Sequence, residues 1–169
     1  FFLLRVEGVD QGLANKIPED AAVVVIARPR REFADVEIQT LRTWVQSGGS
    51  VLALLDPDPQ LNWNPFLSYL GLAMGQSSVA HDSKYRPETH LPSDRLLIYS
   101  NNFSSHASAT RANRDPANLV AAFSGAAALE KLKGTDLKVN FTITTEPGSW
   151  EDVNGNFEFD AGPETKKSF

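Results

Sequence analysis

The chain has 169 residues, of which 41% are hydrophobic and 22% are charged, and its formal net charge is -5 at pH 7. This length fits one domain with a continuous core, and the composition argues against an intrinsically disordered chain. The acidic balance argues against a nucleic-acid partner, because phosphate binding needs clustered lysine and arginine. The chain has no cysteine, which excludes disulfides, thiolate metal sites and cysteine nucleophiles. No apolar run approaches the roughly 18 residues that a transmembrane helix needs.

Two apolar runs with a helical segment between them predict a βαβ unit. Residues 21–27 (AAVVVIA) and 50–56 (SVLALLD) are continuous apolar runs, as in strands that are covered on both faces. Between them, apolar residues recur at helical spacing through residues 36–45, and Gly48-Gly49 supplies a left-handed helix end. Two strands joined in this way run parallel, with a right-handed crossover.

The rest of the chain gives weaker patterns. Asn64-Pro65 is a typical helix start, because asparagine is favoured as a cap and proline in the first turn. Residues 76–93 are polar and contain prolines, which predicts a loop or a β-ribbon insertion. The remaining strand candidates are residues 95–100 (RLLIYS), 119–123 (LVAAF) and 139–145 (VNFTITT).

These elements predict an α/β fold with a mainly parallel sheet and flanking helices, plus a β-rich insertion or tail. We place this domain in residues 1–150, and a polar tail or loop in residues 151–169. The chain starts in the strand-like segment 1–6 without an initiator methionine and stops without a terminating pattern. We therefore expect it to be part of a longer protein.

Four charged residues follow the two predicted parallel strands. Arg28 and Arg30 come after the first strand, and Asp56 and Asp58 come after the second. Open α/β sheets bind their ligands at this edge, so these four residues are the candidate ligand or partner site. The alternative, which we favour for the aspartates, is that Asp-Pro-Asp-Pro forms the turn after the strand.

A hydrolase or carbohydrate-active enzyme is the alternative function for the same aspartates. It requires Asp56 or Asp58 to lie roughly 5 to 9.5 Å from a second carboxylate in a cleft. His81, His90 and His106 have no metal-ligand spacing, and the sequence contains neither a nucleophile elbow nor a glycine-rich phosphate loop. We therefore assign no catalytic residue.

The acidic segment near the end of the chain has the spacing of a calcium loop. Oxygen-bearing side chains occupy loop positions 1, 3, 5, 7 and 9, and they are Asp152, Asn154, Asn156, Glu158 and Asp160. Two departures weaken the pattern, because Phe157 replaces the glycine of the sharp turn and Pro163 stands at position 12. We favour a hydrated turn without metal, and the alternative is a calcium-dependent recognition module. No other cofactor is predicted.

Five segments of the chain match the pattern of a known family. They are residues 17–27 (IPEDAAVVVIA) and 37–57 (EIQTLRTWVQSGGSVLALLDP), with shorter pieces at 104–106, 120–130 and 144–150. In these segments the chain resembles the soluble domain of the gliding-motility-type ABC transporter auxiliary proteins. This resemblance implies a fold similar to the class I glutamine amidotransferases and the flavodoxin-like group. Because no cysteine is present, the amidase chemistry of those enzymes is not implied.

The same resemblance implies a location and a set of partners. It implies an extracytoplasmic, periplasmic domain that works with an ABC permease and ATPase. Membrane segments outside this chain would anchor it to the cytoplasmic membrane. We therefore expect a non-enzymatic domain that acts by binding a partner or a cargo. A homo-oligomer, or a pairing with a related auxiliary subunit, is a further expectation.

Overall fold

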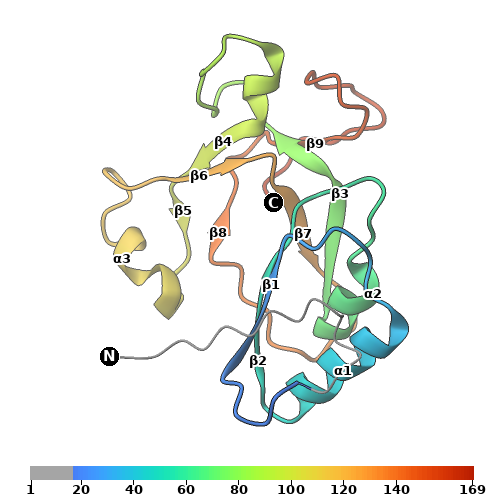
Figure 1. The fold of residues 1–169 in the computed structure, drawn as a ribbon. Helices are drawn as coiled ribbons and strands as arrows, with labels where there is room; N and C mark the ends of the chain where they lie inside the picture. The colour runs from blue at the N-terminus through green and yellow to red at the C-terminus, as the bar shows by residue number, and fades with distance from the viewer. Residues whose placement is uncertain (1–16) are drawn as a thin grey trace. The chain divides into compact units, whose positions relative to one another are not determined.

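The computed structural model describes residues 17–169 and divides the chain into two compact units, Phe1–Leu55 and Asp56–Phe169 (Figure 1). The first unit contains β1 (Val23–Ala27), α1 (Asp35–Gln46) and β2 (Ser50–Leu54). The second unit contains α2 (Asn64–Leu67), β3 (Leu72–Ala80), β4 (Leu97–Ser100), β5 (Asn102–Phe103), α3 (Thr110–Asn113), β6 (Ala121–Ser124), β7 (Ala127–Lys131), β8 (Ile143–Thr144) and β9 (Trp150–Asp152). It also contains the short 3-10 helices η1 (Ser68–Leu70), η2 (Pro92–Leu96) and η3 (Ala107–Ala109). The strand-like segment 1–6 lies outside the described residues.

The first unit is the predicted βαβ unit. β1 and β2 pair in parallel, from Val23 opposite Ser50 to Ala27 opposite Leu54. α1 lies between the two strands in the sequence and occupies the predicted helical segment. The parallel pairing and the helix are therefore confirmed.

Two features fix the ends of α1. At its start, Glu37 accepts the backbone N–H of Ala34 at 2.8 Å, so a carboxylate satisfies a donor that the helix itself leaves unpaired. Glu37 is buried and also accepts hydrogen bonds from both terminal nitrogens of Arg31, at 2.9 and 3.1 Å. At the end of α1, Gly48 has a φ of +92°, which confirms the predicted glycine cap. Arg31 is therefore a structural residue.

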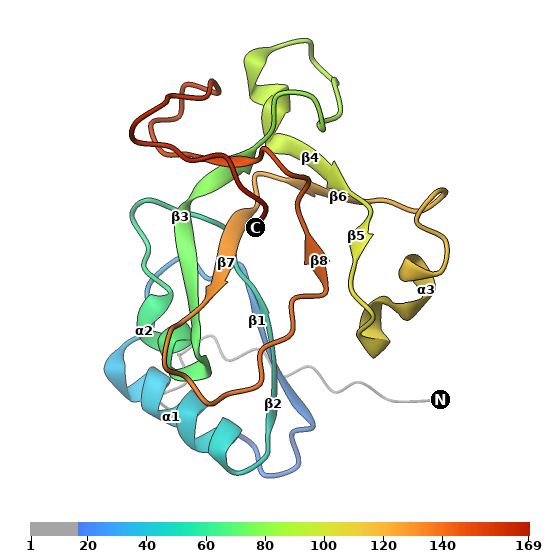
Figure 2. The ribbon, with the colours of Figure 1, turned by 180° about the vertical axis from the view of Figure 1, so that it is seen from behind.

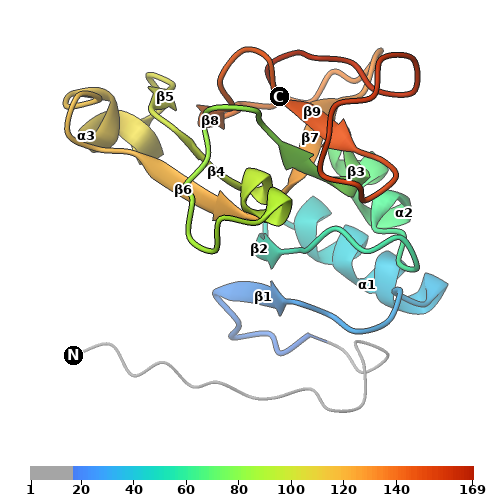
Figure 3. The same cartoon turned by 90° about the horizontal axis from the view of Figure 1, so that it is seen from above.

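β3 is the central strand of the second unit. β7 pairs with one edge of β3 and β9 with the other, both antiparallel, in the order β7-β3-β9. β4 pairs with β6, and β5 with β8, as two further antiparallel sheets (Figure 3). Gly125, with a φ of +61°, lies between β6 and β7. The chain thus passes from one small sheet to another at this glycine.

The apolar core of the second unit includes residues from three strands. Val79 of β3, Ile98 of β4 and Ala128 of β7 form a buried cluster, and Phe169 packs against it. Trp150 of β9 is also fully buried. Figure 2 shows the C-terminus between β7 and β8. Phe169 therefore packs over the buried cluster and shields it in part from solvent.

The predicted helix start at Asn64-Pro65 is confirmed, but the asparagine is not the cap. Trp63 is the residue before the helix, and Asn64 is the first helical residue. The Oδ1 atom of Asn64 accepts the N–H of Met74 at 2.8 Å, and its Nδ2 atom donates to the carbonyl of Met74 at 3.2 Å. Gly71, with a φ of +73°, ends η1. The asparagine therefore ties α2 to β3.

The prediction of a mainly parallel sheet with flanking helices, in a flavodoxin-like or glutamine amidotransferase-like fold, is wrong. Among the described residues, only β1 and β2 pair in parallel, and the other strand pairs are antiparallel. α1 has 12 residues, whereas α2 and α3 have four each. No described helix is long and apolar enough to cross a membrane. The two apolar runs that predicted strands covered on both faces are not covered in this way, because Val25, Leu52 and Leu54 are 54%, 50% and 54% exposed.

The other predicted strands form with different bounds. β4 lies within residues 95–100, β6 overlaps residues 119–123, and only two residues of 139–145 belong to β8. The segment 76–93, predicted as a loop or ribbon, begins with the second half of β3. The predicted tail, residues 151–169, begins inside β9 and belongs to the second unit.

Substitution of Glu37 tests its role at the start of α1. We expect Glu37→Ala to lower the free energy of unfolding by about 1–3 kcal/mol, because the N–H of Ala34 and the guanidinium of Arg31 both lose this acceptor. Urea denaturation followed by circular dichroism measures the loss. The matched control is Gln39→Ala, at an exposed position of the same helix, which should cost less than about 0.5 kcal/mol. Equal effects of the two substitutions would contradict the role of Glu37.

Candidate functional site

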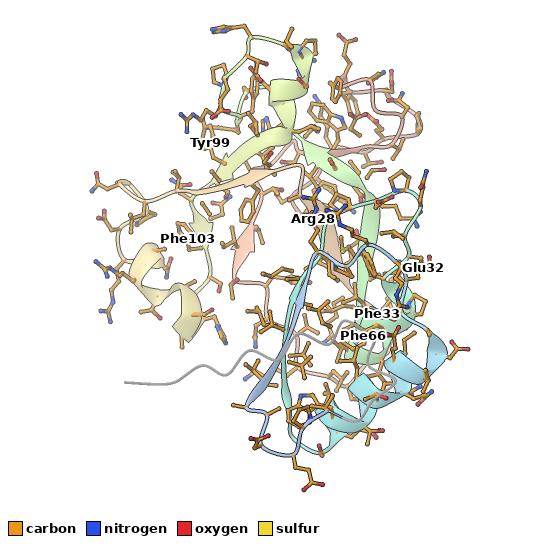
Figure 4. The ribbon with its side chains drawn as sticks, in the orientation of Figure 1. Arg28, Glu32, Phe33, Phe66, Tyr99 and Phe103 are labelled. Carbon is orange, nitrogen blue, oxygen red and sulfur yellow. The ribbon has the colours of Figure 1, made fainter. Side chains whose placement is uncertain are left out.

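The four predicted strand-end residues are divided between the two units. Arg28 and Arg30 are exposed in the segment between β1 and α1, and Figure 4 labels Arg28 at the end of β1. Asp56 and Asp58 lie at the start of the second unit. The backbone N–H of Arg28 donates to the carbonyl of Leu54 at 2.9 Å, which continues the β1-β2 pairing. A binding site made of these four side chains stays a prediction.

The two aspartates take part in the turn before α2. The Oδ1 atom of Asp58 accepts the N–H of Gln60 at 2.8 Å, and its carbonyl accepts the N–H of Leu61 at 3.1 Å. Asp56 is exposed, and its carbonyl accepts the indole N–H of Trp63 at 3.2 Å. These are the contacts that the structural interpretation of Asp-Pro-Asp-Pro expects.

The acidic segment after β9 folds around the carboxylate of Asp152. Its Oδ1 atom accepts the N–H groups of Gly155 and Asn156, at 2.9 and 3.2 Å, and its Oδ2 atom accepts the N–H of Phe157 at 3.1 Å. Asp152 is buried, and Phe157 has a φ of +64° at the position where a calcium loop has glycine. Asp152 therefore binds backbone donors of its own loop.

Asp160 and Glu164 close the same loop from its other end. The Oδ2 atom of Asp160 accepts the side-chain amides of Asn154 and Asn156, both at 2.7 Å. The buried Glu164 accepts the N–H of Val153 at 3.1 Å and that of Asp160 at 2.9 Å. The described residues contain no group of three or more histidine, aspartate or glutamate side chains that could hold a metal ion. The loop is held by its own carboxylates, and calcium binding stays a prediction.

Aromatic and cationic side chains attach this loop to the second unit. The ring of Phe159 meets that of Trp150 edge-on, with centroids 5.9 Å apart. The Nζ atom of Lys166 lies 5.3 Å from the Trp150 centroid and 4.5 Å from the Phe159 centroid, and it also pairs with Asp82. Arg95 donates to the carbonyl of Phe157 at 2.6 Å. The segment predicted as a polar tail is thus packed against its neighbours.

A second buried carboxylate, Asp94, organises the loop between β3 and β4. Its Oδ2 atom accepts three consecutive backbone N–H groups, those of Glu88, Thr89 and His90, at 2.8 to 2.9 Å. Its Oδ1 atom accepts the hydroxyl of Thr89 at 2.7 Å. The pKa of Asp94 is lowered, mainly by the hydrogen bond from the Thr89 hydroxyl and further by the three backbone hydrogen bonds. Burial acts in the opposite direction and raises the pKa. This role was not predicted, because Asp94 matches no sequence motif.

The buried histidine also has a structural role. The Nδ1 atom of His81 accepts the N–H groups of Ser83 and Lys84 at 3.0 and 3.2 Å. The ring proton therefore sits on Nε2, which donates to the carbonyl of Pro147 at 3.2 Å. His81 thus joins the chain after β3 to the chain before β9.

An apolar pocket of about 290 Å³ lies in the second unit, between β7 and the segment that contains β8. Its volume is at the lower end of the range for small-molecule pockets, roughly 300–1,000 Å³. Phe123, Leu129 and Phe141 line it and are 36%, 43% and 38% exposed. Sequence patterns did not indicate the pocket, because its walls come from strands that are far apart in the chain.

One half-buried carboxylate has a raised pKa. Burial is the main cause of the raised pKa of Glu151. The positive charge of Lys167 lowers this pKa, and the negative charge of Glu130 raises it. The carboxylate lies over Gly75, where a larger residue would collide with it. Such shifts are common at functional sites, but ion-pair networks also produce them. Here burial is the main cause, and Lys167, which pairs with Glu130, opposes the rise, so the raised pKa of Glu151 does not by itself mark a functional site.

Acid titration tests the role of Asp94. The pKa of Asp94 is lower in the folded chain than its usual value of 3.8. The ionised carboxylate therefore stabilises the fold fully above pH 3.8, and this stabilisation is lost as the pH falls through the folded-state pKa. We expect Asp94→Asn to reduce the melting temperature at neutral pH, and the difference from the original chain to shrink below about pH 3.8. Calorimetric melts across this range measure it. Asp136→Asn, at an exposed position, should show no such trend, and a pH-independent effect at Asp94 would contradict the prediction.

Calorimetric titration tests the calcium alternative. We expect no binding heat up to millimolar calcium, because Asp152 accepts backbone N–H groups and Asp160 accepts amide N–H groups inside the loop. Magnesium is the control for weak, nonspecific binding to an acidic chain. Calcium heat that disappears in Asp152→Asn would contradict the expectation and establish the calcium loop.

Comparison with solved structures finds a similar fold over part of the chain. The structure of the "mmIFT52 N-terminal domain" is similar, with a TM-score of 0.52 and 21% sequence identity. The match covers 67% of this chain and 52% of that chain, so the present chain spans about half of its length. At this identity, the likeness shows the fold alone. No curated protein matches the chain.

The comparison with family models covers nearly the whole chain. The family described as "ABC-type uncharacterized transport system" matches residues 3–168. The resemblance to ABC transporter auxiliary proteins is therefore confirmed at the level of the family. The chain belongs to the ABC-type uncharacterized transport system family.

Proposed function

We propose that the chain is a non-enzymatic, extracytoplasmic domain that serves an ABC transport system by binding a partner protein at the apolar pocket. Membership of the family supports the link to transport. The observation that carries the binding role is the pocket lining, where the large apolar side chains of Phe123, Leu129 and Phe141 are open to solvent. Clustered apolar side chains on a surface mark interaction sites.

The chemistry of the lining favours binding over catalysis. The described residues that line the pocket include no charged side chain and no histidine. The hydroxyl of Ser100, one of the polar groups there, donates to the carbonyl of Thr144 at 2.6 Å. An uncharged pocket of this kind suits the apolar side chains at the centre of a protein interface.

The partner protein in our proposal is the ABC permease. The permease is the membrane component of an ABC system, and an extracytoplasmic domain meets it without crossing the bilayer. A role in gliding motility is a narrower form of the same proposal, and it is supported by the resemblance carried by residues 17–27 and 37–57.

Site-specific crosslinking in intact cells tests the proposed partner. The photoreactive residue p-benzoylphenylalanine replaces Leu129 or Phe141 at the pocket, in the full-length protein and with the transport system expressed. We expect an adduct with the permease, identified by mass spectrometry. The controls carry the same residue at Gln39 and Thr43, which are exposed on α1.

The controls decide how the crosslinks are interpreted. An adduct with the permease from the two pocket positions, but not from α1, supports the proposal. If neither pocket position yields the permease while the variants are folded and present at normal levels, the pocket is not the partner site and the proposal fails.

A further inference from the structure

Asn154 is the one asparagine in the sequence that a glycine follows. An Asn-Gly pair is chemically labile, because the backbone nitrogen of the glycine can attack the asparagine side chain and no Cβ stands in the way. Asn154 and Gly155 both lie in the loop that follows β9 (Figure 1), and both are exposed to solvent. Water therefore reaches this pair, so protection from the attack has to come from the hydrogen bonds of the loop.

Deamidation of this pair takes two steps. In the first, the nitrogen of Gly155 bonds to Cγ of Asn154, the bond between Cγ and Nδ2 breaks, and the amide nitrogen leaves as ammonia with the proton from Gly155. In the second, water hydrolyses the cyclic imide, and residue 154 becomes aspartate or isoaspartate. Water is the one reactant that the chain does not supply.

Three hydrogen bonds hold the groups that would react. The N–H of Gly155, which makes the attack, donates to Oδ1 of the buried Asp152 at 2.9 Å. In the amide of Asn154, Nδ2 donates to Oδ2 of Asp160 at 2.7 Å, and Oδ1 accepts the N–H of Asn156 at 3.1 Å. The attacking nitrogen and the leaving nitrogen are therefore each held by a different carboxylate, and both have to be released before the reaction can take place.

The negative charge of Asp152 acts in the same direction as its hydrogen bond. The attack requires the Gly155 nitrogen to lose its proton, which leaves a negative charge on the nitrogen. A carboxylate at hydrogen-bond distance disfavours that charge, because like charges repel. A carboxylate is also too weak a base to remove the proton of a backbone amide. Asp152 therefore keeps the Gly155 nitrogen in its unreactive, protonated form.

We propose that Asn154-Gly155 is a modification site that the folded loop protects, so that the pair deamidates only in molecules whose loop has opened. In the closed loop, Asp152 and Asp160 hold the two nitrogens that take part in the reaction. In the open loop both nitrogens are free, and the pair reacts as it does in an unstructured peptide. This inference depends neither on the apolar pocket nor on the transport partner.

The modification prevents the loop from closing again. Aspartate at position 154 would place a carboxylate where Nδ2 now lies 2.7 Å from Asp160, and the two negative charges would repel each other. Isoaspartate adds one methylene group to the backbone, which moves the three N–H groups that follow out of line with Asp152. Either product therefore marks a chain whose loop has opened once.

Ageing of the purified chain tests the proposal. One sample stays folded and the other is unfolded in guanidinium chloride, in the same mildly alkaline buffer and at the same temperature. Peptide mass spectrometry follows deamidation of Asn154 over time, and electron-transfer fragmentation distinguishes isoaspartate from aspartate. We expect deamidation to be at least about tenfold slower in the folded sample, because only the molecules with an open loop react.

Two variants separate the hydrogen bond from the charge of the loop. Asp160→Ala removes the acceptor of the Asn154 amide, and we expect the folded variant to deamidate at Asn154 about fivefold faster than the original chain. Glu158→Ala is the matched control, because it removes an exposed carboxylate of the same loop that accepts no hydrogen bond from the described residues. Its rate should equal that of the original chain. Circular dichroism confirms that both variants fold.

Two results would overturn the proposal. Equal rates in the folded and the unfolded sample would show that the loop gives no protection. Equal acceleration by the two variants would assign the effect to charge and not to the contact with Asp160. If Asp160→Ala does not fold, hydrogen exchange of the Gly155 amide in the original chain takes its place. Slow exchange supports the proposal, and exchange as fast as in the unfolded chain contradicts it.

Discussion

The pairing of β3 on both of its edges is the constraint on which the second unit depends. It is the one described strand that pairs with two other strands, and it brings β7 and β9 into one sheet although the chain between them is long. This pairing places Val79 in the buried cluster and Trp150 in the interior. The acidic loop then begins from a fixed strand, and the segment that follows it returns to the core at Phe169. The pocket, the acidic loop and the end of the chain are all positioned through β3.

The sequence predicted the first unit well because its signals are local. The helical spacing in residues 36–45 and the glycine at position 48 determine α1 and its end, and a helix that connects two paired strands implies that they are parallel. The second unit depends on contacts between distant segments, and its strands have two to nine residues. Short strands of this kind carry little periodicity, and no local pattern shows which ones pair. The prediction of a mainly parallel sheet assumed that the strands of the second unit pair in parallel, as β1 and β2 do. The strands of the second unit pair antiparallel instead.

The candidate site could be predicted only in part, for a related reason. The strand-end hypothesis assumed a wide parallel sheet whose edge gathers ligands, and β1 and β2 are the described strands that pair in this way. The calcium spacing was visible in the sequence, but the direction of the Asp152 carboxylate depends on the left-handed conformation of Phe157, which composition does not reveal. Asp94 gave no signal, because its three backbone donors lie in an irregular loop before it. The pocket needs the whole topology, since its two walls meet only after β3 has paired.

The carboxylates of Asp94, Asp152 and Glu164 have a consequence for the maturation of the protein. Small secreted domains commonly secure their irregular loops with disulfides. This chain contains no cysteine, and hydrogen bonds to buried carboxylates hold two of its loops instead. These cross-links form as soon as the backbone is in place, so they need neither an oxidant nor a disulfide isomerase. Thiol reductants leave them intact, and the domain can therefore mature equally well in an oxidising or a reducing compartment.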